Sequence, residues 1–241
     1  MPFLTLSRER TRRQVARWHD VTMSGHTFVL PPGDALPRIV TLPETVSEAV
    51  ASSDTGAVLF WSQAEAHLVI PPFPVAKHYE AEGWHGGPVQ SLLDRPRVVG
   101  VLLLRLGGIA AGVFNGERLL ASKVDSPYVH GRNRKGGSSS ARYQRRREGQ
   151  SRILFDKACE MLREVLEPHR ARLEHFIVGG DRMTIQAFEK RCPYVKSLQR
   201  IRLNRVLDVP DPRLKVLEEA GRLLYMSKVI TFTPPLPPSP A

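Results

Sequence analysis

The chain has few cysteines, and its apolar residues are not gathered into long runs. Cys159 and Cys192 are the only cysteines among 241 residues, and neither has a Cys or His neighbour at metal-ligand spacing. This argues against a zinc site and against a disulfide framework, so we expect two buried thiols. No apolar run approaches the ~20 residues that span a bilayer, and the Arg-rich start lacks the apolar stretch and cleavage site of a secretory signal. We therefore expect a soluble, cytoplasmic protein with no membrane partner.

Motifs for nucleotide and metal chemistry are also missing. Gly179-Gly180-Asp181 lacks the Lys-Ser/Thr pair of a phosphate loop and the spacing of a dinucleotide fingerprint, so we interpret it as a helix-capping turn. Asp125 and Asp181 could be paired as metal ligands of a nuclease, but no further carboxylate stands with them in a recognisable motif. The sequence therefore predicts no metal and no other cofactor.

Basic residues, in contrast, are concentrated in two segments. Residues 130–150, called here the basic segment, hold seven Lys or Arg and one acidic residue, and residues 1–17 hold five Arg and one Glu. Such concentration favours a nucleic-acid or anionic partner, because it gathers the free energy of counterion release, although a solvated loop and a basic helix are the simpler alternative. Gly136 and Gly137 free the backbone of the basic segment, so a polyanion could approach it closely.

Residues 1–95 have the pattern of a small α+β region with an accessory role. A basic helix is expected over residues 5–19, and β-prone runs occupy 26–30, 57–62 and 67–70. A second helix is expected over 45–52, because Thr45 and Glu48 have the spacing of a capping box. Trp61 and Trp84 are interpreted as packing residues.

Residues 96–227 predict a second, larger domain, followed by a Pro-rich tail over 228–241. Apolar runs at 98–104, 109–114 and 118–123 indicate an antiparallel meander, with a type I′ turn at Asn115-Gly116. A long helix is expected to begin near Ser140 or Gly149 and to end before Pro168. A strand at 176–178, a helix at 183–190, an edge strand at 201–209 and a helix at 211–225 complete an α/β fold with mixed strand directions.

The basic segment and its surroundings resemble a known family. Three stretches are similar to bacterial VLRF-type release factors: Ala121 to Val129, residues 130–139 and the Arg run of 142–147. These factors are the actinobacterial and Chloroflexi branch of a larger family. That family is related to the central, peptidyl-tRNA-hydrolysing domain of eukaryotic and archaeal class I release factors. The resemblance spans roughly residues 97–225. It implies an RNase H-like α/β domain whose glycine-rich basic loop enters the ribosomal peptidyl-transferase centre and frees a stalled nascent chain.

The resemblance also assigns roles to residues, with one departure. Release factors of this kind use a glutamine near a Gly-Gly pair to position water against the ester, and a backbone amide stabilises the developing charge. Shortly after Gly136 and Gly137, where relatives usually show Gln, this sequence has Ser139, Ser140 and Ala141. The catalytic candidates are therefore Gln144, Gly136, Gly137, Ser139 and Ser140, with Gln150 interpreted as structural. The candidates for RNA binding are Arg132, Arg134, Lys135, Ser138, Arg142, Arg145, Arg146 and Arg147.

Three functions remain open at this point. The first is a codon-independent ribosome-rescue peptidyl-tRNA hydrolase, acting as a monomer on the large ribosomal subunit with peptidyl-tRNA and rRNA as partners. The second is a non-catalytic ribosome or tRNA binder that has lost the loop glutamine. The third is a general binder of double-stranded RNA or DNA that uses the basic helix near the start of the chain; under the first two readings no DNA partner is expected.

Overall fold

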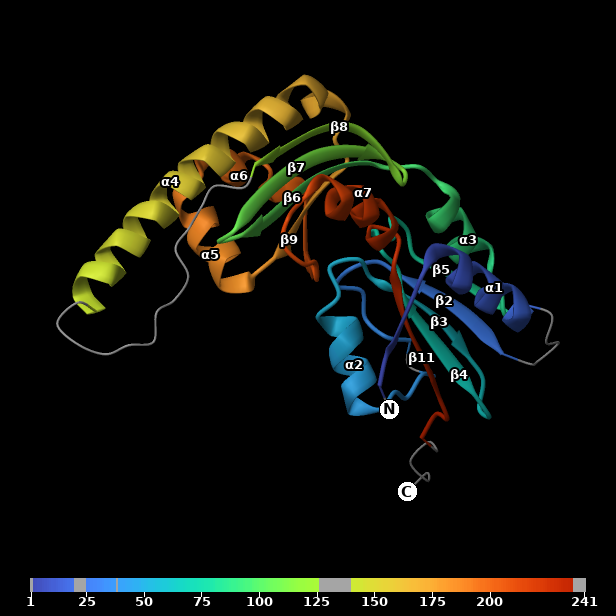
Figure 1. The fold of residues 1–241 in the computed structure, drawn as a ribbon. Helices are drawn as coiled ribbons and strands as arrows, with labels where there is room; N and C mark the ends of the chain where they lie inside the picture. Colours follow the sequence, from blue (N-terminus) through green and yellow to red (C-terminus); the bar gives the residue numbers. More distant parts are fainter. Residues whose placement is uncertain (1, 20–24, 38, 126–139, 236–241) are drawn as a thin grey trace. The chain divides into compact units, whose positions relative to one another are not determined.

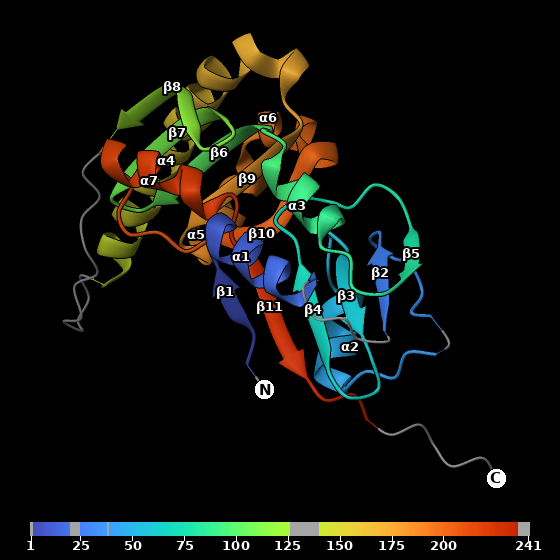
Figure 2. The same cartoon turned by 90° about the vertical axis from the view of Figure 1, so that its right-hand side faces the viewer.

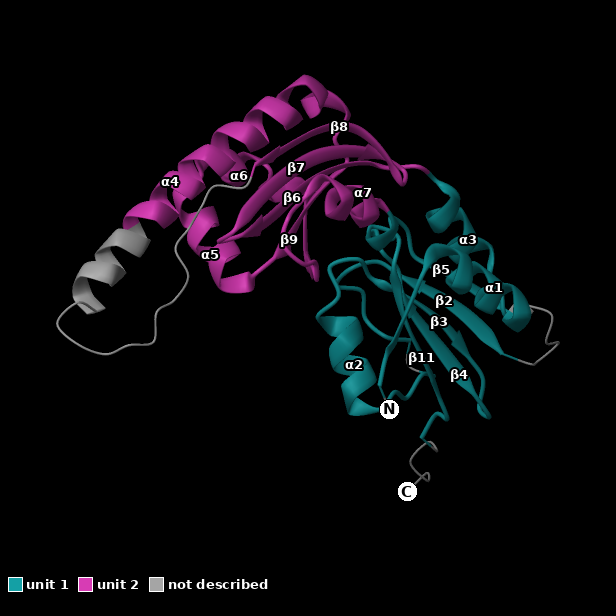
Figure 3. Cartoon of the chain, in the orientation of Figure 1, with its two compact units in different colours: residues 1–95, 222–241 teal, residues 96–221 magenta. Residues whose placement is uncertain are grey.

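The structure is a computed structural model that describes residues 2–19, 25–37, 39–125 and 140–235, without the side chains of residue 19 and residues 140–148. The chain forms two compact units (Figure 3): residues 1–95 and 222–241 make unit 1, and residues 96–221 make unit 2. The elements follow in the order β1 (Leu4–Leu6), α1 (Arg8–His19), β2 (His26–Leu30), α2 (Glu44–Ala51), β3 (Ala57–Trp61), β4 (Ala66–Ile70), β5 (Tyr79–Glu82), α3 (Gly87–Asp94), β6 (Val98–Arg105), β7 (Gly108–Asn115), β8 (Arg118–Asp125), α4 (Ser140–Leu166), η1 (Glu167–Arg172), β9 (His175–Gly180), α5 (Arg182–Arg191), α6 (Pro193–Ser197), η2 (Gln199–Ile201), β10 (Arg202–Leu207), α7 (Leu214–Leu223) and β11 (Ser227–Phe232).

Unit 1 is built on a six-stranded antiparallel sheet with the order β1-β11-β4-β3-β2-β5 (Figure 2). Successive residues of a strand point to opposite faces. In β3, Val58 and Phe60 therefore pack with residues of α1 and α3, whereas Ala57 and Leu59 pack with residues of α2. Helices cover both faces, so the predicted α+β class of this region is confirmed.

Three details of unit 1 differ from the sequence-based expectation. The first helix begins only at Arg8, because Leu4–Leu6 pair with β11 as strand β1. The predicted capping box is wrong, since Pro43 occupies the N-cap of α2 and no side chain caps that helix. The tail prediction is wrong for residues 228–232, because Ser227–Phe232 form β11 and pair with β4 inside the sheet.

Aromatic side chains fill one side of this sheet. The indole of Trp18 stacks on the imidazole of His67 with 4.1 Å between ring centroids, and Trp84 meets the same imidazole edge-on at 5.0 Å. The indole N–H of Trp84 donates to the backbone oxygen of Trp61 at 3.3 Å. Trp84 belongs to the buried cluster on this face, and the side chain of Trp61 packs against the cluster on the other face, so both are packing residues, as predicted.

Unit 2 contains a five-stranded mixed sheet with the order β10-β9-β6-β7-β8. Strands β9, β6, β7 and β8 are labelled in Figure 1, and β10 is labelled in Figure 2. The strands β6, β7 and β8 form the predicted antiparallel meander, whereas β9 runs parallel to β6 and β10 runs parallel to β9 at the edge. Helices α4, α5 and α6 pack on one face through a shared apolar cluster. On the other face, Leu217 of α7 lies against Gly112. The predicted mixed-sheet α/β class is confirmed.

The turn between β7 and β8 differs from its prediction. Of the two residues between the strands, only Gly116 has a positive φ, at +64°, and no described non-glycine residue has one. A type I′ turn needs positive φ at both central positions, so that prediction is wrong. A single glycine at the first central position suffices to reverse the chain here.

Among the described helices, none combines the length and the apolar character needed to cross a membrane.

Candidate nucleic-acid interface

Residues 126–139, which include the first ten residues of the basic segment, connect β8 to α4 and lie outside the described residues. This applies to Arg132, Arg134, Lys135, Gly136, Gly137, Ser138 and Ser139. The backbone of α4 includes Ser140, Arg142, Gln144, Arg145, Arg146 and Arg147, whose side chains are outside the description. The helix thus begins at the earlier of the two predicted positions, and Gln144 lies about one turn inside it. The roles assigned to these residues stay predictions.

The structure does define where the chain leaves the sheet of unit 2 toward the basic segment. Asp125, the last residue of β8, pairs with Ile109 of β7, which in turn pairs with Leu104 of β6, which pairs with Gly180 at the end of β9. These four residues form one row across the sheet. The basic segment therefore departs from the end of the sheet at which β9 ends and α5 begins.

Two ion pairs connect the last residues of β8 to α4. The ammonium group of Lys123 pairs with the carboxylate of Glu164, and the ammonium group of Lys157 pairs with the carboxylate of Asp125. Each is at least partly exposed, so each contributes little to the stability of the fold. Their consequence is geometric: the strand before the basic segment and the helix after it are held together. Asp125 is engaged in this contact.

The second half of α4 is built into the apolar core. Leu154, Ala158 and Leu162 are fully buried, whereas the side chain of Ile153 is 68% exposed. A methyl group at Gly149 would have no neighbour within 4 Å. The helix is therefore anchored from about Leu154 onward, and the Arg run lies in the part of the helix that precedes this anchor.

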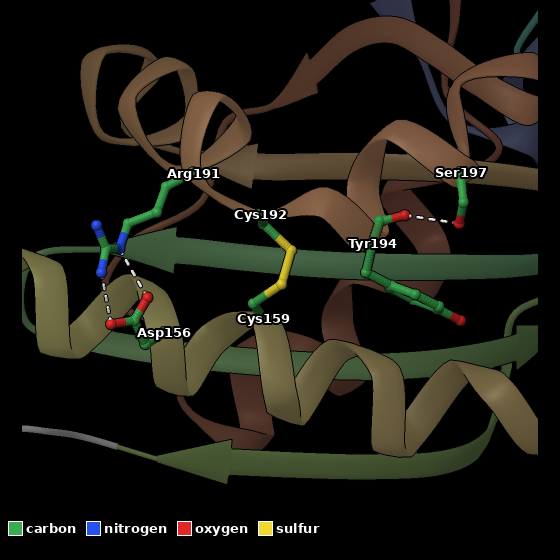
Figure 4. Close-up of a disulfide and its surroundings, with 6 residues drawn as sticks. All are labelled: Asp156, Cys159, Arg191, Cys192, Tyr194 and Ser197. Atoms are coloured by element: carbon green, nitrogen blue, oxygen red, sulfur yellow. Dashed lines mark hydrogen bonds and ion pairs between the residues drawn. A yellow bond between two sulfur atoms is a disulfide. The ribbon is translucent and has the colours of Figure 1, made fainter.

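A disulfide between Cys159 and Cys192 strengthens the anchor (Figure 4). The prediction of two buried thiols is wrong, because α4 and the end of α5 bring the two Cα atoms to 5.5 Å, within the range that a disulfide spans. The spacing of 33 residues along the sequence gives no sign of this approach. Asp156 lies one turn before Cys159 in α4. The guanidinium of Arg191, at the end of α5, donates to both of its carboxylate oxygens at 2.7 and 2.8 Å and lowers the pKa of that carboxyl.

The Gly179-Gly180-Asp181 turn serves structure. Gly180 has φ of +113°, and a side chain there would meet the backbone oxygen of Leu104 at 2.2 Å, so only glycine fits. The carboxylate of Asp181 accepts from the backbone N–H of Thr184 at 2.8 Å and from its hydroxyl at 2.6 Å. These hydrogen bonds lower the pKa of Asp181. The predicted helix cap is confirmed, and this carboxylate is engaged by Thr184.

Among the described residues, no group of three or more His, Cys, Asp or Glu is placed to hold a metal ion.

The arginines of α1 are partly neutralised within unit 1. The guanidinium of Arg12 lies 3.1 Å from the carboxylate of Asp94, which also pairs with Arg8 at 3.9 Å. Arg13 pairs with Glu9 at 2.9 Å, one turn earlier in the same helix. Three of the five arginines counted at this end of the chain therefore already have acidic partners, which lowers the charge that α1 offers to a nucleic acid.

Relatives of the chain are translation factors. Over 117 residues it is 28% identical to peptide chain release factor subunit 1 of Archaeoglobus fulgidus, an alignment that covers 48% of this chain and 29% of that protein. It is 22% identical over 257 aligned positions to the same factor of Aeropyrum pernix, covering 90% of this chain and 69% of that one. The chain thus spans under a third of the length of the Archaeoglobus fulgidus protein that it matches.

A crystal structure of the archaeal translation termination factor aRF1 aligns with 91% of this chain and 73% of its own, at 19% identity and a TM-score of 0.42. The protein family described as Actinobacteria/chloroflexi VLRF1 release factor matches residues 97–229. This match covers more than half of the chain, including nearly all of unit 2 and the basic segment. The chain therefore belongs to the Actinobacteria/chloroflexi VLRF1 release factor family.

Proposed function

We propose that this protein is a ribosome-rescue factor that hydrolyses peptidyl-tRNA on the large ribosomal subunit and releases stalled nascent chains without reading a codon. The observation that carries this proposal is the family match over residues 97–229, which includes a basic, glycine-broken segment between β8 and α4. The disulfide and the buried residues of α4 from Leu154 onward anchor the helix in which that segment ends, which suits a loop that must reach into a narrow RNA site.

The proposed reaction is the addition of water to the ester carbon that joins the peptide to the tRNA ribose. The carbon–oxygen bond to the ribose breaks, the peptide leaves with a carboxyl group, and the ribose oxygen takes up a proton. In this account the side chain of Gln144 positions the water, and the backbone amides near Gly136 and Gly137 stabilise the oxyanion. Ser139 and Ser140 stand where relatives carry glutamine, and their hydroxyls are the other candidates for orienting water.

RNA binding is assigned to the basic residues of the same segment. Arg142, Arg145 and Arg146 share one helical face by their spacing, and Arg147 points elsewhere together with Gln144. Each guanidinium that neutralises a phosphate of rRNA or tRNA adds to a salt-dependent affinity. Further contacts are proposed for Arg132, Arg134, Lys135 and Ser138. The protein acts as a cytoplasmic monomer without a cofactor in this proposal.

A second candidate function is a ribosome or tRNA binder without hydrolytic activity. One observation favours it: residues 139–141 are Ser, Ser and Ala, so the glutamine expected near the Gly-Gly pair is missing. In that case the charge and the fold are retained while the chemistry is lost.

Nascent-chain release from stalled ribosomal complexes separates the two functions. Wild-type protein is expected to release peptide above the buffer rate, and Gln144→Ala is expected to slow release by roughly 10–100-fold, because a water-positioning group is lost. Ser139→Ala and Ser140→Ala test the hydroxyls in the same way. Gln150→Ala is the matched control in the same helix and should release at the wild-type rate. Binding of the ribosomal complex with no release by wild-type protein would favour the second candidate.

A further inference from the structure

Unit 2 carries a second basic stretch, which matches the basic segment in net charge. Residues 182–205 hold seven Lys or Arg and one acidic residue, the same balance as residues 130–150. These residues form α5, α6, η2 and the first part of β10. Unlike the basic segment, the whole stretch lies among the described residues, so its contacts are defined.

Some of these charges are neutralised within unit 2. The guanidinium of Arg202 lies 2.6 Å from the carboxylate of Glu189, which is the one acidic residue of the stretch. Arg191 is paired with Asp156 of α4. Lys190, Lys196 and Arg200, called here the α6 basic surface, are exposed, and no described residue forms an ion pair with them.

Two members of the α6 basic surface line the same depression. It has a volume of about 580 Å³, is open to solvent, and is bordered by Gln186, Glu189, Lys190 and Lys196. The carboxylate of Glu189 is engaged by Arg202, so its charge is offset at the border. Two ammonium groups and a side-chain amide remain as hydrogen-bond donors, a set that suits the oxygens of a phosphate group.

The elements under this surface are held rigidly. Cys192, the residue before α6, is joined to α4 by the disulfide, and a guanidinium N–H of Arg170 donates to the backbone oxygen of Ser197 at 2.7 Å. Within α6, the side chain of Tyr194 is buried, and its hydroxyl donates to the carboxylate of Glu167 at 2.8 Å. Burial, helped by this hydrogen bond, raises the pKa of Tyr194 to about 12. The backbone that carries this surface therefore loses little conformational freedom on binding.

We propose that the α6 basic surface binds the phosphodiester backbone of structured RNA, as a second contact separate from the basic segment. This rests on the proposed function in that the RNA is part of the ribosome–tRNA complex. Strand β10 begins at Arg202 opposite Phe176, near the start of β9, whereas the basic segment leaves the sheet in the row of Gly180, at the end of β9. The bound RNA therefore lies along unit 2 and is contacted toward both ends of its sheet.

The test compares two neutralising double variants of equal charge. Lys190→Gln/Lys196→Gln removes the proposed contact, and Arg213→Gln/Lys215→Gln removes two exposed charges at the start of α7, the helix on the other face of the sheet. Affinity is measured between about 50 and 200 mM salt for two probes, deacylated bulk tRNA and purified large ribosomal subunits. Circular dichroism checks that each variant is folded.

Loss of two phosphate contacts is expected to weaken binding on the order of tenfold near 0.1 M salt and to reduce the slope of log affinity against log salt by about 1.5. Which probe responds distinguishes a tRNA contact from an rRNA contact. If Lys190→Gln/Lys196→Gln binds both probes as the control variant does, the proposal is overturned, whether or not peptide release is seen. If the lysine variant loses affinity while wild-type protein releases no peptide, this surface stands and the hydrolytic function fails. Wild-type protein that binds neither probe contradicts both.

Discussion

Removal of the Cys159–Cys192 disulfide should lower the free energy of unfolding of unit 2 by about 3–4 kcal/mol. The two cysteines are 33 residues apart, and a cross-link of that span removes roughly 12 cal/mol/K of entropy from the unfolded chain, or about 3.7 kcal/mol at 25 °C. The exposed Asp156–Arg191 ion pair next to it cannot compensate for this loss. For a unit of this size, the melting temperature should fall by roughly 10–15 °C.

The assay is thermal unfolding followed by far-ultraviolet circular dichroism, with and without a reductant. Wild-type protein should show the shift on reduction, and Cys159→Ala/Cys192→Ala should be insensitive to the reductant. The alanine variant controls for direct effects of the reductant on either unit. Two titratable thiols in wild-type protein unfolded without reductant would contradict the presence of the disulfide, and a melting temperature that does not change on reduction would contradict its contribution to stability.

Three further predictions concern the cap, a buried histidine and the basic segment. Asp181→Ala should lower the free energy of unfolding of unit 2 by about 1 kcal/mol in a chemical denaturation at pH 7. Asp181→Asn should lower it less. The hydrogen bonds from Thr184 lower the pKa of Asp181 in the folded protein, so the advantage of wild type over Asp181→Asn should begin to decrease as the pH falls below about 4, the ordinary pKa of an Asp carboxyl, and should be lost as the pH falls through the lowered pKa. Burial lowers the pKa of His67 to about 4. The free energy of unfolding of unit 1 should therefore be constant above pH 6.5 and should fall between pH 6.5 and 4, by on the order of 2 kcal/mol at pH 5. Urea titrations followed by tryptophan fluorescence measure this dependence, and a wild-type pH profile identical to that of His67→Gln would contradict it. Reversing the charge of Arg142, Arg145 and Arg146 should flatten the salt dependence of ribosome binding, and an unchanged slope would contradict their assignment to phosphates.

Sequence patterns sufficed where the signal is local. Apolar runs separated by glycine pairs and Asn-Gly predicted the β6–β7–β8 meander, and the register confirms it. The order Gly-Gly-Asp followed by an amphipathic run predicted the cap of α5, because the N-cap needs one side-chain acceptor at a fixed position. The basic segment was recognised from charge density and its two glycines alone.

Features that depend on distant parts of the chain were missed. Strand β11 is continuous with a Pro-rich tail, and it becomes a strand by pairing with β4 and with β1, both more than 150 residues earlier. The disulfide requires α4 and α5 to pack against the same face of the sheet, which the spacing of the cysteines does not reveal. The α6 basic surface was missed in the sequence because its basic residues alternate with the apolar residues through which α5 and α6 pack on the sheet. A count of charge in a sliding window of about 24 residues would have found it.

Release of a nascent peptide from a large ribosomal subunit that carries peptidyl-tRNA is the most direct test of the hydrolytic function. Wild-type protein should release the peptide without a codon in the decoding site, Gln144→Ala should release it at least about tenfold more slowly, and Gln150→Ala should match wild type. Wild-type protein that binds the complex and releases no peptide above the buffer rate would contradict the hydrolytic function.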